Sequence, residues 1–211
     1  MMSKFFINIC LGFVKLTGLL PVLIFFKPKI LKLNKKQKLP KGCIIVSNHK
    51  SLLDFPFYLL VFPFRTIRFL MAEVLYNKSK FFGFFLNAIG GIKVERNSKD
   101  FSFVANALEV LDKKGTVGIF PEGRLPVNGK PFPFTVSTAY IAINSAAPIV
   151  PVFTDGNYGI SKRASVVIGE PFYLTDYCKE DLTETEQLNH LTETLENKVR
   201  GLEEFLRKDE K

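Results

Sequence analysis

The sequence predicts an α/β fold in which a mixed, largely parallel sheet is flanked by helices. Short β-branched apolar runs, such as the one at 42–46, alternate along the chain with segments of helical periodicity. Charged residues gather directly after these runs, where parallel sheets place their ligand sites. The length of 211 residues and a hydrophobic content of 47% fit a single domain with an adequate core.

The chain opens with an apolar stretch at 5–26, about long enough for a membrane-crossing helix, which needs roughly 20 residues. Lys15 and Pro21 disfavour a straight span, since a lysine at mid-bilayer costs about 2.5–3.5 kcal/mol. A helix lying in the interface, with Lys15 reaching the head groups, fits better. A cleaved signal peptide is disfavoured because no small-residue cleavage site is evident. We therefore expect a membrane-associated apolar segment and basic stretch at 1–38, followed by the main domain at 39–211.

The basic stretch indicates an anionic partner. Its lysines are Lys27, Lys29, Lys32, Lys35, Lys36, Lys38 and Lys41. Each charge near an anionic membrane surface is worth about 1 kcal/mol, and positive residues favour the cytoplasmic face. A soluble basic linker is the alternative for the lysines farthest from the apolar stretch. A net charge of +9 is also compatible with a nucleic-acid-binding protein. Because no helix-turn-helix or zinc-finger pattern is present, we expect no nucleic-acid partner.

The run at 42–46 predicts a buried strand, and His49 follows it, five residues before Asp54. Helical positions five apart lie roughly 140° from each other. The two side chains can therefore touch only if His49 lies in the bend after the strand and Asp54 in the first turn of the next helix. Imidazole can take a proton near neutral pH, and a carboxylate on its other nitrogen fixes the tautomer. The pair suits activation of a hydroxyl; a capping histidine beside a surface aspartate is the alternative.

Alternating elements continue along the chain, and Gly115 is expected to cap the third of the next helices. The predicted helices are at 51–62, 80–88 and 101–114, and the predicted strands are at 66–72, 91–95 and 116–120.

Two of these strands lead into arginines. The strand at 91–95 is followed by Arg96, and Glu122, Gly123 and Arg124 come after the strand at 116–120. Proline and glycine around Glu122 predict a tight turn. Arginine grips phosphate with two parallel hydrogen bonds. A solvated surface cation is the commoner fate of one arginine, but two at strand ends near the histidine favour an anion site.

The remainder reads as a loop, a helix and two strands, at 125–133, 138–146, 149–153 and 165–168. The loop suits either a substrate lid or a plain surface connection. The tail at 183–208 is an amphipathic helix with a possible capping box formed by Thr183 and Glu186. We expect this helix to pack on the domain, and a dimer-forming helix is the alternative.

His190 lies beside the apolar stripe of the tail helix and is expected to be partly exposed, without a catalytic role. The three cysteines show no metal-ligand spacing, and we expect reduced thiols.

Four segments, NHKSLLD, GGIKVER, IFPEGR and APIVPV, resemble in this order the four motifs of the glycerolipid acyltransferase family. The resemblance covers roughly residues 40–175, and four ordered matches are far more specific than any one. It implies that His49 deprotonates the acceptor hydroxyl and that Asp54 supports it. The glycerol phosphate would be held by Arg96, Glu122, Gly123 and Arg124. The segment 150–152 would have a structural or acyl-binding role.

The resemblance implies an O-acyltransferase that moves a fatty acyl group from acyl carrier protein or coenzyme A to a lysoglycerophospholipid, above all 1-acylglycerol-3-phosphate. It implies no metal and no cofactor beyond this co-substrate. The third motif, which reads Glu122-Gly123-Arg124, is one residue shorter than the usual Glu-Gly-Thr-Arg. That form is similar to enzymes that reacylate lysophosphatidylethanolamine. The alternatives are such a lysophospholipid acyltransferase and a non-catalytic lipid-binding membrane protein. The acceptor, the acyl chain length and the oligomeric state stay open.

Overall fold

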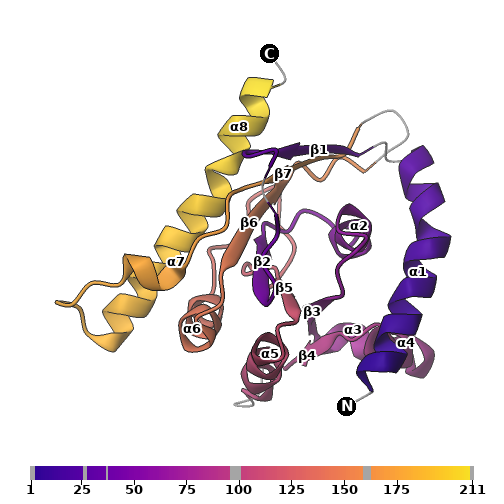
Figure 1. The fold of residues 1–211 in the computed structure, drawn as a ribbon, viewed down its shortest axis with the longest axis horizontal. Coiled ribbons are helices and arrows are strands. Elements are labelled where there is room, and N and C mark those ends of the chain that lie inside the picture. The colour runs from indigo at the N-terminus through magenta and orange to yellow at the C-terminus, as the bar shows by residue number, and fades with distance from the viewer. Residues whose placement is uncertain (1–2, 26–27, 37, 96–100, 159–162, 210–211) are drawn as a thin grey trace.

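The computed structural model describes residues 3–25, 28–36, 38–95, 101–158 and 163–209. Within them, seven strands form one sheet in the order β1-β7-β6-β2-β5-β3-β4 (Figure 1). All neighbouring strands are parallel except β6 and β7. The predicted mixed, largely parallel sheet is therefore confirmed. The strands are β1 (Lys29–Lys32), β2 (Cys43–Ser47), β3 (Ile67–Ala72), β4 (Ile92–Val94), β5 (Thr116–Ile119), β6 (Ile149–Thr154) and β7 (Ser165–Ile168).

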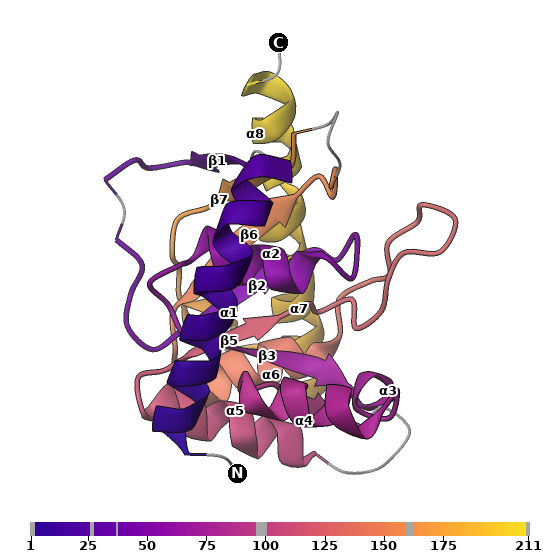
Figure 2. The same ribbon diagram turned by 90° about the vertical axis from the view of Figure 1, so that its right-hand side faces the viewer.

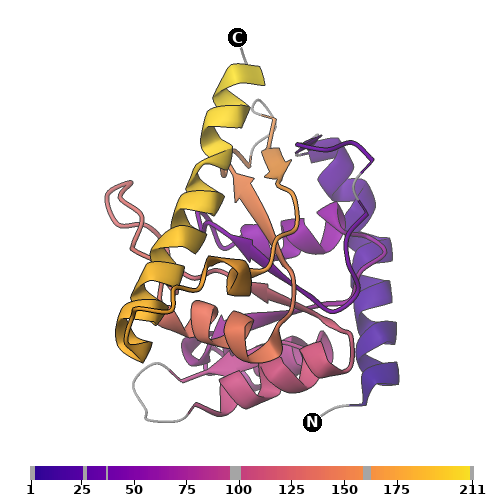
Figure 3. The same ribbon diagram turned by 60° about the vertical axis from the view of Figure 1, so that its left-hand side comes forward.

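Helices cover both faces of the sheet. On one face lie α5, α6 and α7, and on the other α1, α2 and α4. Figure 3 shows α7 and α8 following each other along the side of the domain away from α1. The helices are α1 (Lys4–Phe25), α2 (Asp54–Val61), α3 (Glu73–Tyr76), α4 (Lys80–Ala88), α5 (Ser102–Asp112), α6 (Val136–Ser145), α7 (Glu184–Arg200) and α8 (Leu202–Asp209), with a 3-10 turn, η1, at Leu174–Tyr177.

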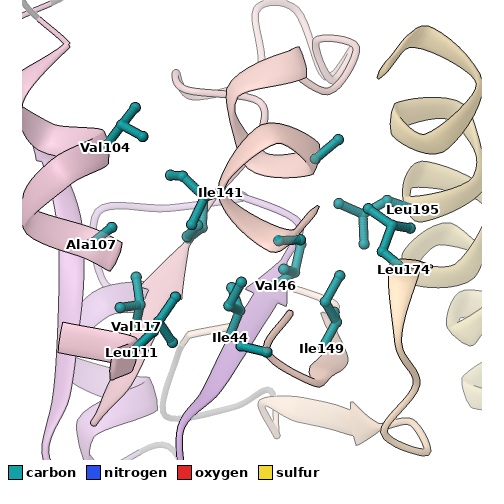
Figure 4. Close-up of a cluster of buried hydrophobic side chains, with 14 of the residues drawn as sticks. Ile44, Val46, Val104, Ala107, Leu111, Val117, Ile141, Ile149, Leu174 and Leu195 are labelled. Carbon is teal, nitrogen blue, oxygen red and sulfur yellow. The ribbon is translucent and has the colours of Figure 1, made fainter. Parts of the chain in front are cut away.

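Strand β2 lies at the centre of the sheet and is buried along its whole length. Successive side chains of a strand point to opposite faces. Ile44 and Val46 accordingly pack into the cluster formed with α5, α6 and α7 (Figure 4). Cys43 and Ile45 pack into the second cluster, on the side of α1 and α2. A strand buried on both faces explains why its sequence is continuously apolar rather than alternating.

Helix α1 is docked onto α2 through an inward-facing lysine. The Lys15 ammonium donates to the carbonyls of Phe62 and Pro63, with N···O distances of 3.2 and 3.0 Å, and to that of Arg65. These carbonyls follow the C-terminal end of α2, where unpaired acceptors and negative helix-dipole charge favour a cation. Burial lowers the pKa of Lys15 to about 8. The structure thus turns Lys15 toward the protein, not toward lipid head groups as expected.

The opposite side of α1 is apolar and exposed. Within the described residues, no helix combines the length and apolarity needed to cross a bilayer. Ile7 and Leu11 face the core. The exposed apolar side chains of α1, called here the outer face of α1, are Phe5, Phe6, Ile9, Phe13 and Leu16.

Most predicted elements are present, within a few residues of their expected ends, but several features differ, among them the short helices α3 and η1, which the sequence did not predict. The sequence did not reveal β1, which pairs in parallel with β7 and brings part of the basic stretch into the sheet. Helix α5 ends with Lys114 in the left-handed conformation (φ 56°), not with Gly115. Gly115 instead donates its amide to the Val110 carbonyl at 2.8 Å, where an added Cβ would lie 2.8 Å from the carbonyl oxygen. The tail forms two helices that meet at Gly201, although the predicted capping box of Thr183 is confirmed.

Candidate active site

The site lies at the carboxyl edge of three adjacent strands. Strand β2 pairs in parallel with both β5 and β6, so the ends of all three strands meet at one edge. His49 follows β2, Glu122 follows β5, and Thr154 is the last residue of β6. The loop after β5 projects from the body of the domain in Figure 2.

His49 and Asp54 are in direct contact. The His49 Nδ1 atom lies 2.8 Å from Asp54 Oδ2. Helix α2 begins at Asp54, so the expected arrangement, with His49 in the bend and Asp54 in the first helical turn, is confirmed. The neutral tautomer that donates to this carboxylate has its proton on Nδ1, which leaves the lone pair of Nε2 for a substrate. The His49 side chain is 15% exposed and that of Asp54 is fully buried.

The buried Asp54 carboxylate is satisfied by donors on both oxygens. Oδ2 also accepts the backbone amides of Lys50 and Ser51, at 2.7 and 2.9 Å. Oδ1 accepts the Tyr158 hydroxyl at 2.5 Å. These bonds offset the loss of hydration that a buried charge suffers. Both oxygens of the carboxylate therefore have hydrogen-bond donors opposite the imidazole.

The plane of the His49 ring is set by an aromatic stack. The ring centroids of His49 and Phe120 are 4.4 Å apart, with an interplanar angle of 15°. Phe120 is in turn stacked on Phe69, at 5.4 Å. Since Phe120 directly precedes the turn that carries Glu122, the end of β5 orients the imidazole presented by β2.

Asn48 joins the ends of two strands. Its Nδ2 atom donates to the Thr154 carbonyl at 2.9 Å, and its Oδ1 atom accepts the Thr154 amide at 2.8 Å. This pair of hydrogen bonds to the Thr154 backbone fixes the position of His49 relative to β6, the strand formed by the fourth motif-like segment. Sequence reasoning missed Asn48, Phe120 and Tyr158. Asn48 and Phe120 lie within two of the motif-like segments, NHKSLLD and IFPEGR, whereas Tyr158 lies outside all four.

Glu122 faces the histidine segment from the β5 side. Its side chain is 3% exposed, and Oε1 lies 3.4 Å from the His49 backbone amide, which donates to it. Oε2 has no hydrogen-bond partner among the described residues. Burial raises the pKa of Glu122, and this rise is opposed first by the hydrogen bond from the His49 amide and then by nearby positive charge, including that of Arg200 and Lys50. The Glu122 side chain is thus a buried acceptor for the backbone of the histidine segment.

The two residues after Glu122 have different surroundings. Gly123 has φ +66° and donates its amide to the Phe120 carbonyl at 3.0 Å, which confirms the predicted tight turn. The Arg124 side chain is exposed, with its guanidinium 4.7 Å from the Phe132 ring centroid. Arg96 lies outside the described residues. The structure therefore brings His49, Asp54 and Glu122 together and places Arg124 on the following loop.

That loop is anchored by the tail of the chain. Arg200 of α7 donates to the Phe132 carbonyl at 3.1 Å and to Glu196 at 2.7 Å. Glu196 also accepts the Phe134 amide at 3.0 Å. The C-terminal helix thus holds the returning end of the loop that carries Arg124. The described residues contain no cluster of three or more His, Cys, Asp or Glu side chains that could hold a metal ion.

Comparison with known proteins identifies the family. The family model described as Acyltransferase matches residues 30–155, more than half of the chain. The chain belongs to the acyltransferase family. The matched range of this acyltransferase contains His49, Asp54 and Glu122, so the family resemblance of its four segments is confirmed.

Curated relatives share parts of this acyltransferase. It is 32% identical over 113 residues to human 1-acyl-sn-glycerol-3-phosphate acyltransferase beta, covering 53% of this chain and 41% of the relative. It is 25% identical over 193 residues to the chloroplastic 1-acyl-sn-glycerol-3-phosphate acyltransferase BAT2 of Brassica napus, covering 86% and 54%. The chain thus spans about half the length of these relatives.

A solved structure shows the same fold. The crystal structure of the 1-acyl-sn-glycerophosphate acyltransferase PlsC from Thermotoga maritima superposes with a TM-score of 0.63. The match covers 94% of this chain and 79% of that one, at 23% sequence identity. The mixed sheet and its flanking helices are therefore shared architecture.

The charge of Glu122 should lower stability at neutral pH. Because the pKa of Glu122 is higher in the folded than in the unfolded state, protonation stabilises the fold fully below the unfolded-state pKa, about 4.3. This stabilisation is lost as the pH rises through the folded-state pKa. Glu122→Gln keeps the acceptor for the His49 amide but removes the charge, so it should raise the melting temperature at pH 7 by about 2 °C. The gain should vanish toward pH 4 in a thermal-unfolding series. The exposed Glu184→Gln serves as the control, and a Glu122→Gln gain independent of pH would contradict the account.

Proposed function

We propose that this acyltransferase moves a fatty acyl group from a thioester to the free hydroxyl of 1-acylglycerol-3-phosphate. The observation that carries the proposal is the contact of 2.8 Å between His49 and the buried Asp54. It orients an imidazole with an available Nε2 atom at the edge of the sheet. The names of the curated relatives support the choice of acceptor.

In the proposed reaction, His49 acts as a general base. Nε2 takes the proton of the acceptor hydroxyl while that oxygen attacks the thioester carbonyl carbon and a C–O bond forms. Asp54 stabilises the resulting imidazolium. When the tetrahedral intermediate collapses, the C–S bond breaks and His49 returns its proton to the departing sulfur. The products are the ester and a free thiol, so the route uses the thioester as a co-substrate and needs no covalent acyl-enzyme.

The acceptor phosphate is assigned to the cationic rim of the site. Arg124 lies two residues after Glu122, and Lys50 is an exposed cation next to His49. Arg96 would contribute a second guanidinium through the motif resemblance. Glu122 would accept a glycerol hydroxyl through its Oε2 atom, which has no hydrogen-bond partner within the described part of the chain, and Gly123 provides the turn that separates Glu122 from Arg124.

We also infer that the outer face of α1 lies against the cytoplasmic surface of the membrane. With Lys15 turned inward, the described side chains of this face carry no charge, and Phe13 and Leu16 are 66% and 76% exposed. On the neighbouring α4, Phe81 and Phe84 are exposed as well. Exposed apolar side chains gathered on neighbouring helices are typical of interaction sites, and the lysines after α1 suit anionic lipid.

Loss of the proposed base should abolish acyl transfer. His49→Ala should lower turnover by about 10²–10⁴-fold, which is the contribution typical of general-base catalysis, and His190→Ala should leave it unchanged. Product formation from radiolabelled acyl thioesters of coenzyme A and of acyl carrier protein measures this and identifies the donor. Retention of a tenth of the activity by His49→Ala would remove the imidazole from the mechanism.

The same assay decides the acceptor. A phosphate monoester, as in 1-acylglycerol-3-phosphate, carries more negative charge than the phosphodiester of lysophosphatidylethanolamine, so arginines on the rim should favour the former. Equal or preferred use of the diester would favour the lysophospholipid alternative. Absence of turnover with every lysolipid would favour the non-catalytic lipid-binding alternative.

Polar substitutions on the outer face of α1 should release the protein from membranes. Phe13→Ser combined with Leu16→Ser should reduce binding to vesicles containing phosphatidylglycerol by at least about a hundredfold, since each buried apolar side chain contributes roughly 1.5–3 kcal/mol and about 1.4 kcal/mol corresponds to tenfold. Vesicle flotation measures the bound fraction. The control is the exposed apolar pair Val127→Ser and Tyr173→Ser, away from α1. Equal binding by both double variants would exclude α1 as the membrane contact.

A further inference from the structure

The Asp54 carboxylate has two differently occupied oxygens. Oδ2 faces His49 and the amides of Lys50 and Ser51. Oδ1 faces the hydroxyl of Tyr158, at 2.5 Å. Tyr158 is 104 residues further along the chain and follows β6, so the contact is built by the fold and not by the local segment.

We propose that Tyr158 is a positioning residue that tunes the basicity of His49 through Asp54, an inference that rests on the proposed function. A donor on Oδ1 draws negative charge away from Oδ2, the oxygen that faces the imidazole. It also prevents the carboxylate from rotating about its Cβ–Cγ bond, so that Oδ2 stays aligned with Nδ1. The unit at the edge of the sheet is then a chain of three side chains, Tyr158, Asp54 and His49.

Tyr158 is itself held by groups that belong to the site. Its ring packs edge-on against Phe57, with centroids 5.1 Å apart, and Phe57 lies on the same helix as Asp54. Its oxygen lies 3.5 Å from the Thr154 hydroxyl, and Thr154 is the backbone partner of Asn48. Burial and the Asp54 charge raise the pKa of Tyr158. The phenol therefore stays protonated and serves as a donor throughout the pH range of an assay.

Other titratable groups near the dyad occupy different positions. Tyr58 is fully buried, and its hydroxyl lies 2.5 Å from that of Ser47, although the charges of Asp54 and Asp155 also act on it. Glu122 contacts the His49 backbone amide, and the charge of Lys50 acts on Glu122. Tyr58 is thus a matched control: a buried tyrosine whose hydroxyl is hydrogen-bonded to Ser47 and not to Asp54.

The first test is the pH dependence of turnover. Tyr158→Phe should lower kcat on the pH plateau by about tenfold, as expected for the loss of one hydrogen bond to a charged group, with little change in KM for the acceptor. More negative charge on Oδ2 favours the imidazolium, so the acid limb of the kcat profile should move to higher pH by about one unit. Tyr58→Phe should leave the limb in place. An unmoved acid limb in Tyr158→Phe, or an equal shift in Tyr58→Phe, would overturn the proposal.

The second test needs no turnover. The His49 imidazole is titrated by ¹⁵N NMR in the wild type, in Tyr158→Phe and in protein with 3-fluorotyrosine at position 158. The midpoint should rise in the phenylalanine variant and fall with fluorotyrosine, whose more acidic phenol donates more strongly. Equal midpoints in wild-type and fluorotyrosine protein would overturn the proposal, even if Tyr158→Phe fails to fold. Absence of acyl transfer by the wild type would refute the proposed function, while this titration would still decide the coupling.

Discussion

The active site depends on one buried carboxylate, that of Asp54, and on the hydrogen-bond donors that surround it. Asp54 is fully buried, and an uncompensated buried charge costs about 3–5 kcal/mol. Its donors come from the bend after β2 and from the segment after β6. The fold must therefore hold these two segments in register, and the imidazole orientation follows from the same contacts.

Sheet topology meets this requirement. Because β2 lies between β5 and β6 and runs parallel to both, each neighbour contributes from its end. Strand β5 supplies Phe120 beneath the imidazole and Glu122 beside its backbone, and β6 supplies the Thr154 backbone that Asn48 binds. More distant elements act on the same edge. Arg200 and Glu196 of α7 anchor the loop that carries Arg124.

The sequence was sufficient to predict those features of the fold and the site that depend on neighbouring residues in the chain. The spacing of five between His49 and Asp54 restricts them to one geometry, and the structure has it. Continuous β-branched runs revealed the central strands because burial on both faces requires them. Strand β1 was missed because its two apolar residues, Ile30 and Leu31, are flanked by Lys29 and Lys32, a sequence typical of a solvated basic segment.

Features that depend on contacts between distant parts of the chain could not be predicted from the sequence. Lys15 reads as a charge within a membrane-seeking helix, and only the position of α2 reveals carbonyls to receive it. Tyr158 has no motif around it, and its contact with Asp54 spans 104 residues. The left-handed end of α5 falls on Lys114, and the glycine that follows it is required instead by its close approach to Val110. For Arg96, which lies outside the described residues, the phosphate role stays a prediction.

The most direct test of the account is the tautomer of His49 in the free protein. The chain has two histidines, so His190→Gln leaves one imidazole to observe by ¹⁵N NMR at a pH above its titration. The account predicts a proton on Nδ1, hydrogen-bonded to Asp54, and an unprotonated Nε2. A proton on Nε2, or a spectrum averaged between the two tautomers, would contradict it.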